Sequence, residues 1–245
     1  MVDRRLVVNA NEFGRSVGIN RGIIEAHERG IVSSVSLMVR WPAVQQAAAY
    51  ARGRSSLSVG LHVDLGEWSC RDGFWRRLYS VAPLHDPGAV EGEVERQLAR
   101  FRDVIGHDPT HIDSHQHVHG REPVCSVLTA LAERLGVPLR GANRYIRYSD
   151  AFHGRTMNGT PFPEAITTTT LLRILTSLPP GVTELGCHPG YADDVEAAYR
   201  EERADEVAVL CDDTVRSALP RLGIELTTFS RLSPMFATNG RRYAV

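Results

Sequence analysis

The sequence predicts an α/β fold, namely a TIM-like (β/α) barrel of about seven strands, either complete or incomplete. Short apolar runs alternate with segments of helical periodicity along the chain. Polar residues follow directly after several of these apolar runs. The chain has 245 residues, 42% of them hydrophobic, which suffices for one sizeable core. We therefore expect a single domain over residues 1–245, with an open doubly wound sheet as the alternative fold.

Each element follows from its local pattern. The apolar runs predict strands over residues 6–10, 32–39, 57–63, 110–114, 138–142, 182–187 and 224–229. The helical periodicity predicts helices over residues 19–29, 43–52, 90–105, 123–135, 169–178, 199–211 and 213–222. The segments 64–88 and 143–163 are predicted to be long loops. Loops of this length inside a domain commonly belong to a functional site.

Composition excludes several classes of function. All 28 basic residues are arginine, so a lysine Schiff base, a pyridoxal phosphate anchor and a P-loop lysine are impossible. The net charge of −1 argues against nucleic-acid binding. The four cysteines form no CxxC motif, and no apolar run near the N-terminus is long enough for a membrane span. We expect a cytoplasmic protein, and the sequence leaves a homo-oligomer open.

The segment THIDSHQHVH carries the strongest chemical signal. Four histidines and Asp113 occupy every second position from 111 to 119, so an extended chain would place them on one face. A buried face of imidazoles is a poor core, because each ring needs hydrogen-bond partners. Imidazole is a common ligand of zinc and similar ions, and Asp113 is placed to orient a ligating histidine. A solvated loop with a chance cluster is the alternative.

Three further residues lie at the end of a predicted strand or just after one, and would converge on the same face of a barrel. Glu12 and His62, together with His115 from the histidine run, would form a site of two histidines and one carboxylate with open positions for water. His188, in GCHPG, is a candidate general acid because its charge changes near neutral pH. The alternatives are a helix cap for Glu12, a structural role for His62 and a turn for His188.

Four segments together resemble the YdjC/ChbG carbohydrate deacetylase family, which includes HpnK-like members. They are VNANEFG, GLH at His62, THIDSHQHVH and CHPG at His188. Their order and spacing match along nearly the whole chain. The resemblance implies a TIM-like barrel with one divalent metal ion, Zn²⁺ or Mg²⁺, held by Glu12, His62 and His115. It also implies that residue 11 is the general base and that His188 is the general acid. The substrate would be an N-acetylated amino sugar, such as an N-acetylglucosamine-type saccharide or glycoconjugate.

Two positions depart from the family pattern Asn-Ala-Asp-Asp-Phe-Gly. Glu12 replaces an aspartate that binds metal, and Asn11 replaces the aspartate that acts as base. An amide is not basic near neutral pH, so Asn11 cannot take the proton of an attacking water molecule. Three explanations stay open: an engineered change that traps substrate, a natural loss of activity, or another base such as Asp113 or a nearby histidine.

Three residues of the long loops are predicted to contact substrate: Trp68, Arg144 and Phe162. The leading hypothesis is a metal-dependent deacetylase in which a metal-activated water attacks the acetamide carbonyl. Two alternatives are a sugar-binding relative without turnover and a metallo-phosphoesterase of the histidine-rich barrel type.

Overall fold

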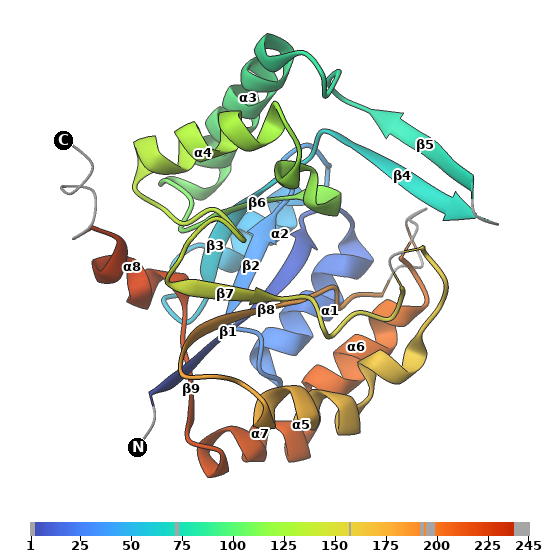
Figure 1. Cartoon of the computed structure of the whole chain (residues 1–245), viewed down its shortest axis with the longest axis vertical. Coiled ribbons are helices and arrows are strands. Elements are labelled where there is room, and N and C mark those ends of the chain that lie inside the picture. The colour runs from blue at the N-terminus through green and yellow to red at the C-terminus, as the bar shows by residue number, and fades with distance from the viewer. Residues whose placement is uncertain (1–2, 72–73, 157, 192–193, 195–198, 238–245) are drawn as a thin grey trace.

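A curled parallel sheet forms the centre of the computed structural model, which describes residues 3–71, 74–156, 158–191, 194 and 199–237. Within these residues the sheet has seven strands in the order β6–β3–β2–β1–β8–β7, with β9 also beside β1 (Figure 1). These strands are β1 (Arg4–Phe13), β2 (Ser34–Leu37), β3 (Ser58–Val63), β6 (Ile112–Ser114), β7 (Ile146–Ser149), β8 (Gly181–Cys187) and β9 (Ile224–Leu226). The strands β6 and β7 lie at the two ends of this order. The predicted α/β barrel, complete or incomplete, is confirmed in its incomplete form.

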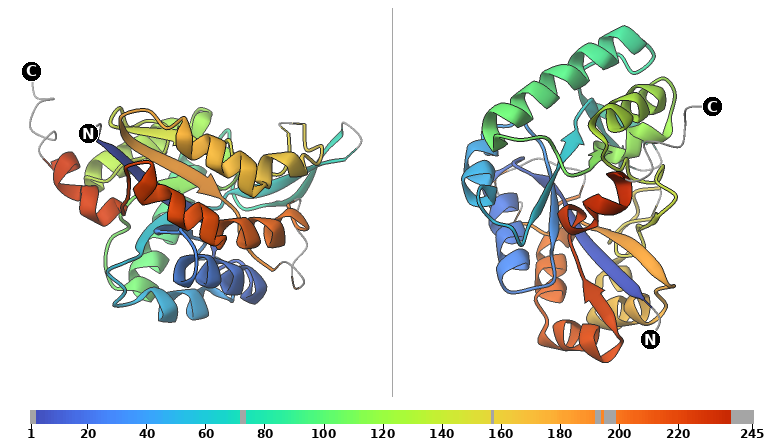
Figure 2. Two further views of the ribbon diagram at one scale, coloured as in Figure 1. Left: turned by 90° about the horizontal axis from the view of Figure 1, so that it is seen from below. Right: turned by 90° about the vertical axis from the view of Figure 1, so that its left-hand side faces the viewer.

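Helices surround the sheet (Figures 1 and 2). They are α1 (Val17–Glu28), α2 (Val44–Ala51), α3 (Pro87–Ile105), α4 (Val124–Leu135), α5 (Thr168–Thr176), α6 (Glu202–Leu210), α7 (Asp213–Arg221) and α8 (Phe229–Ala237). Strands β2 and β3 are buried along their whole length, as expected for parallel strands covered by helices. None of the helices in the described part of the chain is long and apolar enough to cross a membrane.

Helix α1 begins directly after β1 because Ser16 caps it. The Ser16 side chain accepts a hydrogen bond from the backbone N–H of Ile19, which satisfies a donor in the first turn. Before the cap, Gly14 has φ of 91°, and an added Cβ would lie 2.8 Å from the carbonyl oxygen of Met38. Only glycine fits this tight turn. The turn places the end of β1 and the start of α1 at the same edge of the sheet.

The predicted strand over residues 138–142 is wrong. Only Leu139 pairs there, through a single parallel bridge to Ile112. Gly141, with φ of 73°, then turns the chain away. The strand of this region is β7, which begins at Ile146 inside the predicted loop 143–163 and pairs with β8. A short, half-buried strand has little apolar patterning, which is why the sequence did not reveal it.

The predicted loop 64–88 contains an antiparallel hairpin of β4 (Gly66–Arg71) and β5 (Phe74–Ser80). The hairpin extends away from the curled sheet (Figure 1). Most side chains of β5 are exposed, so its sequence lacks the buried face that makes a strand recognisable. Trp68 and Cys70 on β4 and Trp75 on β5 line the cavity described below. The hairpin therefore forms one wall of that cavity.

Candidate active site

A cavity of about 910 Å³ opens at the carboxyl ends of the parallel strands, a size typical of small-molecule sites. The five predicted catalytic and metal-binding residues line it: Asn11 and Glu12 near the end of β1, His62 in β3, His115 after β6 and His188 after β8. Asn11 and His188 are 177 residues apart in the sequence. The structure therefore brings together residues that the sequence placed only at strand ends.

The backbone near the end of β1 presents two consecutive polar side chains to this cavity. In a regular strand, neighbouring side chains point to opposite faces. Here the register with β2 shifts between Ala10 and Phe13, and Glu12 has φ of 66°, a left-handed conformation uncommon outside glycine. An irregularity of this kind re-aims side chains at a strand end. As a result, Asn11 and Glu12 both line the cavity.

The Asn11 amide is held in one orientation by its neighbours. Its Oδ1 accepts hydrogen bonds from Arg140 Nη2 at 2.9 Å and from Asn9 Nδ2 at 3.1 Å. Its Nδ2 therefore faces His188 Nε2, at 3.1 Å. Because an amide nitrogen only donates, His188 Nε2 accepts this bond and the proton of a neutral His188 ring lies on Nδ1.

His188 is buried in a way that favours its neutral form. Burial lowers the pKa of His188 well below its ordinary value, and the nearby His153 ring, 5.2 Å away between centroids, lowers it further. Its Nδ1 has no hydrogen-bond partner among the described residues. A general acid needs a proton to give, and with Asn11 as neighbour the ring does not carry an extra one. The acid role of His188 stays a prediction.

His62 is oriented by Asp113. Its Nδ1 lies 2.7 Å from Asp113 Oδ1, and Asp113 also pairs with Arg140 Nη2 at 2.6 Å. Burial alone would raise the pKa of Asp113, but Arg140 and His62 hold it well below its usual range. This ionised carboxylate fixes the His62 ring, as the sequence predicted for a carboxylate behind a functional histidine.

His115 lies between two carboxylates. Its Nδ1 is 3.3 Å from Glu12 Oε1, and its Nε2 is 3.8 Å from Glu67 Oε2. Burial alone would lower the pKa of His115, but the two carboxylates raise it to about 9. The ring is therefore cationic at neutral pH in this arrangement.

Two buried arginines complete the surroundings of Glu12. Arg15 contacts Glu12 Oε2 at 3.1 Å and Glu67 Oε2 at 2.5 Å, and Arg203 contacts Glu12 Oε2 at 2.5 Å. Burial alone would raise the pKa of Glu12, but Arg203 and Arg15 hold it well below the usual value. Sequence reasoning did not single out Arg15, Glu67 or Arg203. Arg15 directly follows the VNANEFG segment, which was the available signal.

As arranged, the predicted ligands do not fit a metal centre. Within the described residues, no group of three or more His, Cys, Asp or Glu side chains is arranged to hold a metal ion. Glu12 Oε2 already accepts from two guanidinium groups, and the His115 ring faces a carboxylate on each side. Glu12, His62 and His115 do lie together, with the two rings 5.7 Å apart. We therefore assign no chemical step to a metal ion.

The prediction of four histidines on one face is wrong. Residues His115–Gly120 form a 3₁₀ helix in which Gln116 and His117 have φ of 52°, so the alternation of an extended strand ends there. His119 instead bonds Ser114 through Nδ1–Oγ at 2.6 Å. His111 faces the other end of β6, where it stacks on Phe229. Of the four, only His115 and His117 line the cavity.

Two of the three predicted substrate residues line the cavity, and one does not. Trp68 and Phe162 belong to its wall. Arg144 is not among the lining residues; its guanidinium contacts the Tyr145 hydroxyl at 2.5 Å on the surface. Arg144 precedes β7 and thus lies at the amino end of that strand, opposite the cavity. This prediction failed because it assumed that the strand of this region ended at residue 142.

Comparison with known proteins identifies the family. A sequence model described as YdjC-like protein matches residues 5–221. The chain belongs to the YdjC-like family. The resemblance inferred from the four sequence segments is thereby confirmed.

Several known proteins are similar to this chain over nearly their full length. A carbohydrate deacetylase of Geobacillus stearothermophilus is 33% identical over 243 residues, covering 92% of this chain and 97% of the relative. A chitooligosaccharide deacetylase of Serratia marcescens is 31% identical over 264 residues, which cover 94% of this chain and 100% of the relative. The chain also superposes on a solved structure from Enterococcus faecalis that is provisionally assigned to cellobiose-phosphate cleavage. The TM-score is 0.77 at 26% sequence identity, and the match covers 94% of this chain and 99% of the other.

Proposed function

We propose that the cavity binds an N-acetylated amino sugar and that removal of its acetyl group is the reaction class of this chain. The observation that carries the proposal is the convergence of Asn11, Glu12, His62, His115 and His188 on one cavity at the carboxyl ends of the strands. The family relatives named as carbohydrate and chitooligosaccharide deacetylases support the substrate class. Aromatic side chains in the wall, Trp68 and Phe162 among them, suit the apolar face of a sugar ring.

Amide hydrolysis needs a water molecule to lose a proton as it attacks the carbonyl carbon, and it needs a proton for the departing amine. Asn11 lies where a base would act, but its amide cannot take the proton. The Asn11 amide also donates a hydrogen bond to His188 Nε2. This nitrogen would deliver a proton to the departing amine, but as an acceptor it carries none. Loss of general base catalysis typically slows a reaction by about 10²–10⁴-fold. We therefore expect slow hydrolysis by this sequence.

The second candidate function is sugar binding without turnover. The hydrogen bond between Asn11 and His188 specifically favours it, because it stabilises the neutral His188 ring beside an amide that cannot take a proton. The cavity and its aromatic wall serve binding equally well with or without hydrolysis. The two functions differ only in whether acetate is released.

The deciding experiment combines calorimetry with an acetate assay on N,N′-diacetylchitobiose and a panel of N-acetylated sugars. The variant Asn11→Asp should release acetate about 10²–10⁴-fold faster than the native chain, because Arg140 can hold the new carboxylate as the base. Asn143→Asp is the matched control, since Asn143 is a half-buried amide outside the cavity. Binding without acetate in every variant would support the second function. A folded chain that neither binds nor hydrolyses any sugar of the panel would refute the proposal.

A further inference from the structure

Four charged side chains form a buried ion-pair network at the base of the cavity. They are Arg15 and Arg203, with side chains 1% and 0% exposed, and Glu12 and Glu67, with side chains 4% and 3% exposed. Arg15 bridges the two carboxylates, and Arg203 holds Glu12 from the opposite end of the sequence, 191 residues away. All four residues line the cavity.

The charges of this network balance without any added ion. Two guanidinium groups face two carboxylates, and Glu12 Oε2 accepts from both arginines. A divalent cation bound to Glu12 would lie beside two buried positive charges that cannot lose their protons. Repulsion between like charges is strong where water is excluded, and removing an ion from water is costly unless opposite charges surround it. The network therefore opposes the cation that the position of Glu12 would otherwise attract.

Of the two arginines, Arg15 is the one that pairs with both carboxylates of the network. Arg203 also donates to the backbone carbonyls of Tyr199 and His188, so it holds the α6 region against the site. The Arg15 guanidinium reaches Glu12 and Glu67 and lies 5.6 Å from the centroid of the Trp41 ring. Without Arg15, Glu67 loses its guanidinium partner, and of the two network arginines Glu12 keeps Arg203.

We propose that the Arg15 ion pairs with Glu12 and Glu67 take the place of a divalent metal ion at this site, so that the native chain binds no divalent ion between Glu12, His62 and His115. Arg15 is the residue that prevents a divalent ion from binding there. The inference goes beyond the proposed function, since it holds whichever sugar the cavity accepts and is tested without any sugar.

The test titrates Zn²⁺ into chelator-treated protein by calorimetry and counts zinc per chain after dialysis. The variant His62→Ala, measured in parallel, removes a predicted ligand and reveals zinc bound elsewhere. Native chain and His62→Ala should bind the same amount of zinc. Arg15→Leu should gain one additional ion per chain, bound at least tenfold more tightly than any ion at this site in the native chain. Arg15→Leu/His62→Ala should lose that ion again.

A matched control separates the role of Arg15 from a general change in charge. Arg155 lines the same cavity and pairs with Glu202 at 2.6 Å, so Arg155→Leu removes one cavity arginine without touching Glu12. It should gain no zinc. If Arg15→Leu does not fold, Arg15→Gln removes the charge while keeping hydrogen-bond donors, and the same readings apply.

Two outcomes would overturn the inference. The first is a native chain that binds one zinc ion that His62→Ala loses. The second is a folded Arg15 variant that binds no more zinc than the native chain. Neither outcome is read from acetate release or sugar affinity, so the failure of this inference and the failure of the proposed function are measured separately.

Discussion

At the amino end of β6 the His111 ring stacks on Phe229, with centroids 3.9 Å apart, whereas beyond the carboxyl end of the same strand the His115 ring lies between two carboxylates. Only three residues separate these rings in the sequence. Burial lowers the pKa of His111 to about 3, while Glu12 and Glu67 raise that of His115 to about 9 against the opposing effect of burial. Position along a barrel strand, more than residue type, decides whether a histidine packs or faces the site.

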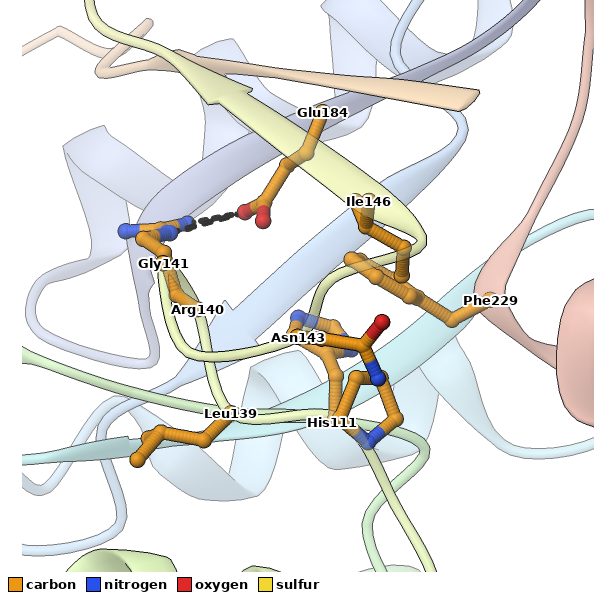
Figure 3. A pocket seen from close by; sticks show the side chains of 9 residues that line it. His111, Leu139, Arg140, Gly141, Asn143, Ile146, Glu184 and Phe229 are labelled. Carbon is orange, nitrogen blue, oxygen red and sulfur yellow. Dashed lines mark hydrogen bonds and ion pairs between the residues drawn. The ribbon is translucent and has the colours of Figure 1, made fainter. Parts of the chain in front are cut away.

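The amino end is also closed, which the carboxyl end is not. The space between His111, Ile146 and Phe229 leaves no room for a water-sized sphere. Figure 3 shows these side chains together with the ion pair between Arg140 and Glu184. Arg140 joins the two ends, because the same guanidinium contacts Asn11 at the cavity. Under the proposed function the amino end serves stability and the carboxyl end serves sugar binding, and each prediction below tests that division.

The largest expected effect is on packing at the amino end. In Gly60→Ala the new Cβ would lie 2.4 Å from the His111 ring, so the ring or the strand must move. Overpacking of this kind lowers the free energy of unfolding by about 1–3 kcal/mol. Urea denaturation measures the change.

Gly92→Ala in α3 is the control for this substitution. Its Cβ would meet only the Arg96 side chain, at 3.7 Å. Replacing a glycine inside a helix should raise the free energy of unfolding by about 0.5–1 kcal/mol. A Gly60→Ala protein as stable as the native chain would show that the His111 end is not closely packed.

Most of this fold could be predicted because buried parallel strands leave continuous apolar runs in the sequence. Residues 146–149 could not, since β7 is half-buried and its pairing with β8 is visible only in three dimensions. The site residues Asn11, Glu12, His62, His115 and His188 could be predicted because barrel enzymes build their active sites at the carboxyl ends of the strands. The partners Arg15, Glu67, Arg140 and Arg203 were missed, because periodicity and strand-end position say nothing about contacts such as that between Arg203 and Glu12, 191 residues apart.

The next effect concerns acid stability. Burial depresses the pKa of His111 to about 3 in the folded chain, against about 6.5 when unfolded. Between these values the unfolded chain binds more protons, so stability should fall as pH drops from about 6.5 towards 3, by up to about 1 kcal/mol per pH unit from this group. His115 adds no slope well below pH 6.5, because there its ring is protonated in the unfolded chain at its ordinary pKa and in the folded chain at its raised pKa.

The variant His111→Leu isolates this contribution. Denaturation of both proteins between pH 6.5 and 4 should give a shallower slope for the variant, whereas their sugar affinities at pH 7 should be equal. Equal slopes would contradict the buried, neutral state of His111. A change in sugar affinity would instead contradict the division between the two ends.

The smallest effect lies at the mouth of the cavity, on β5. Trp75 is 61% exposed and lines the cavity, while its neighbour Phe74 is 74% exposed and does not. Successive residues of a strand point to opposite faces, so these two aromatic residues form a matched pair. Trp75→Ala should weaken sugar binding by about 2–10-fold, the equivalent of about 0.5–1.5 kcal/mol for an aromatic contact. Phe74→Ala should leave the dissociation constant unchanged. Calorimetry measures both, and equal losses in the two variants would mean that the hairpin acts through its own stability and not through contact with the sugar.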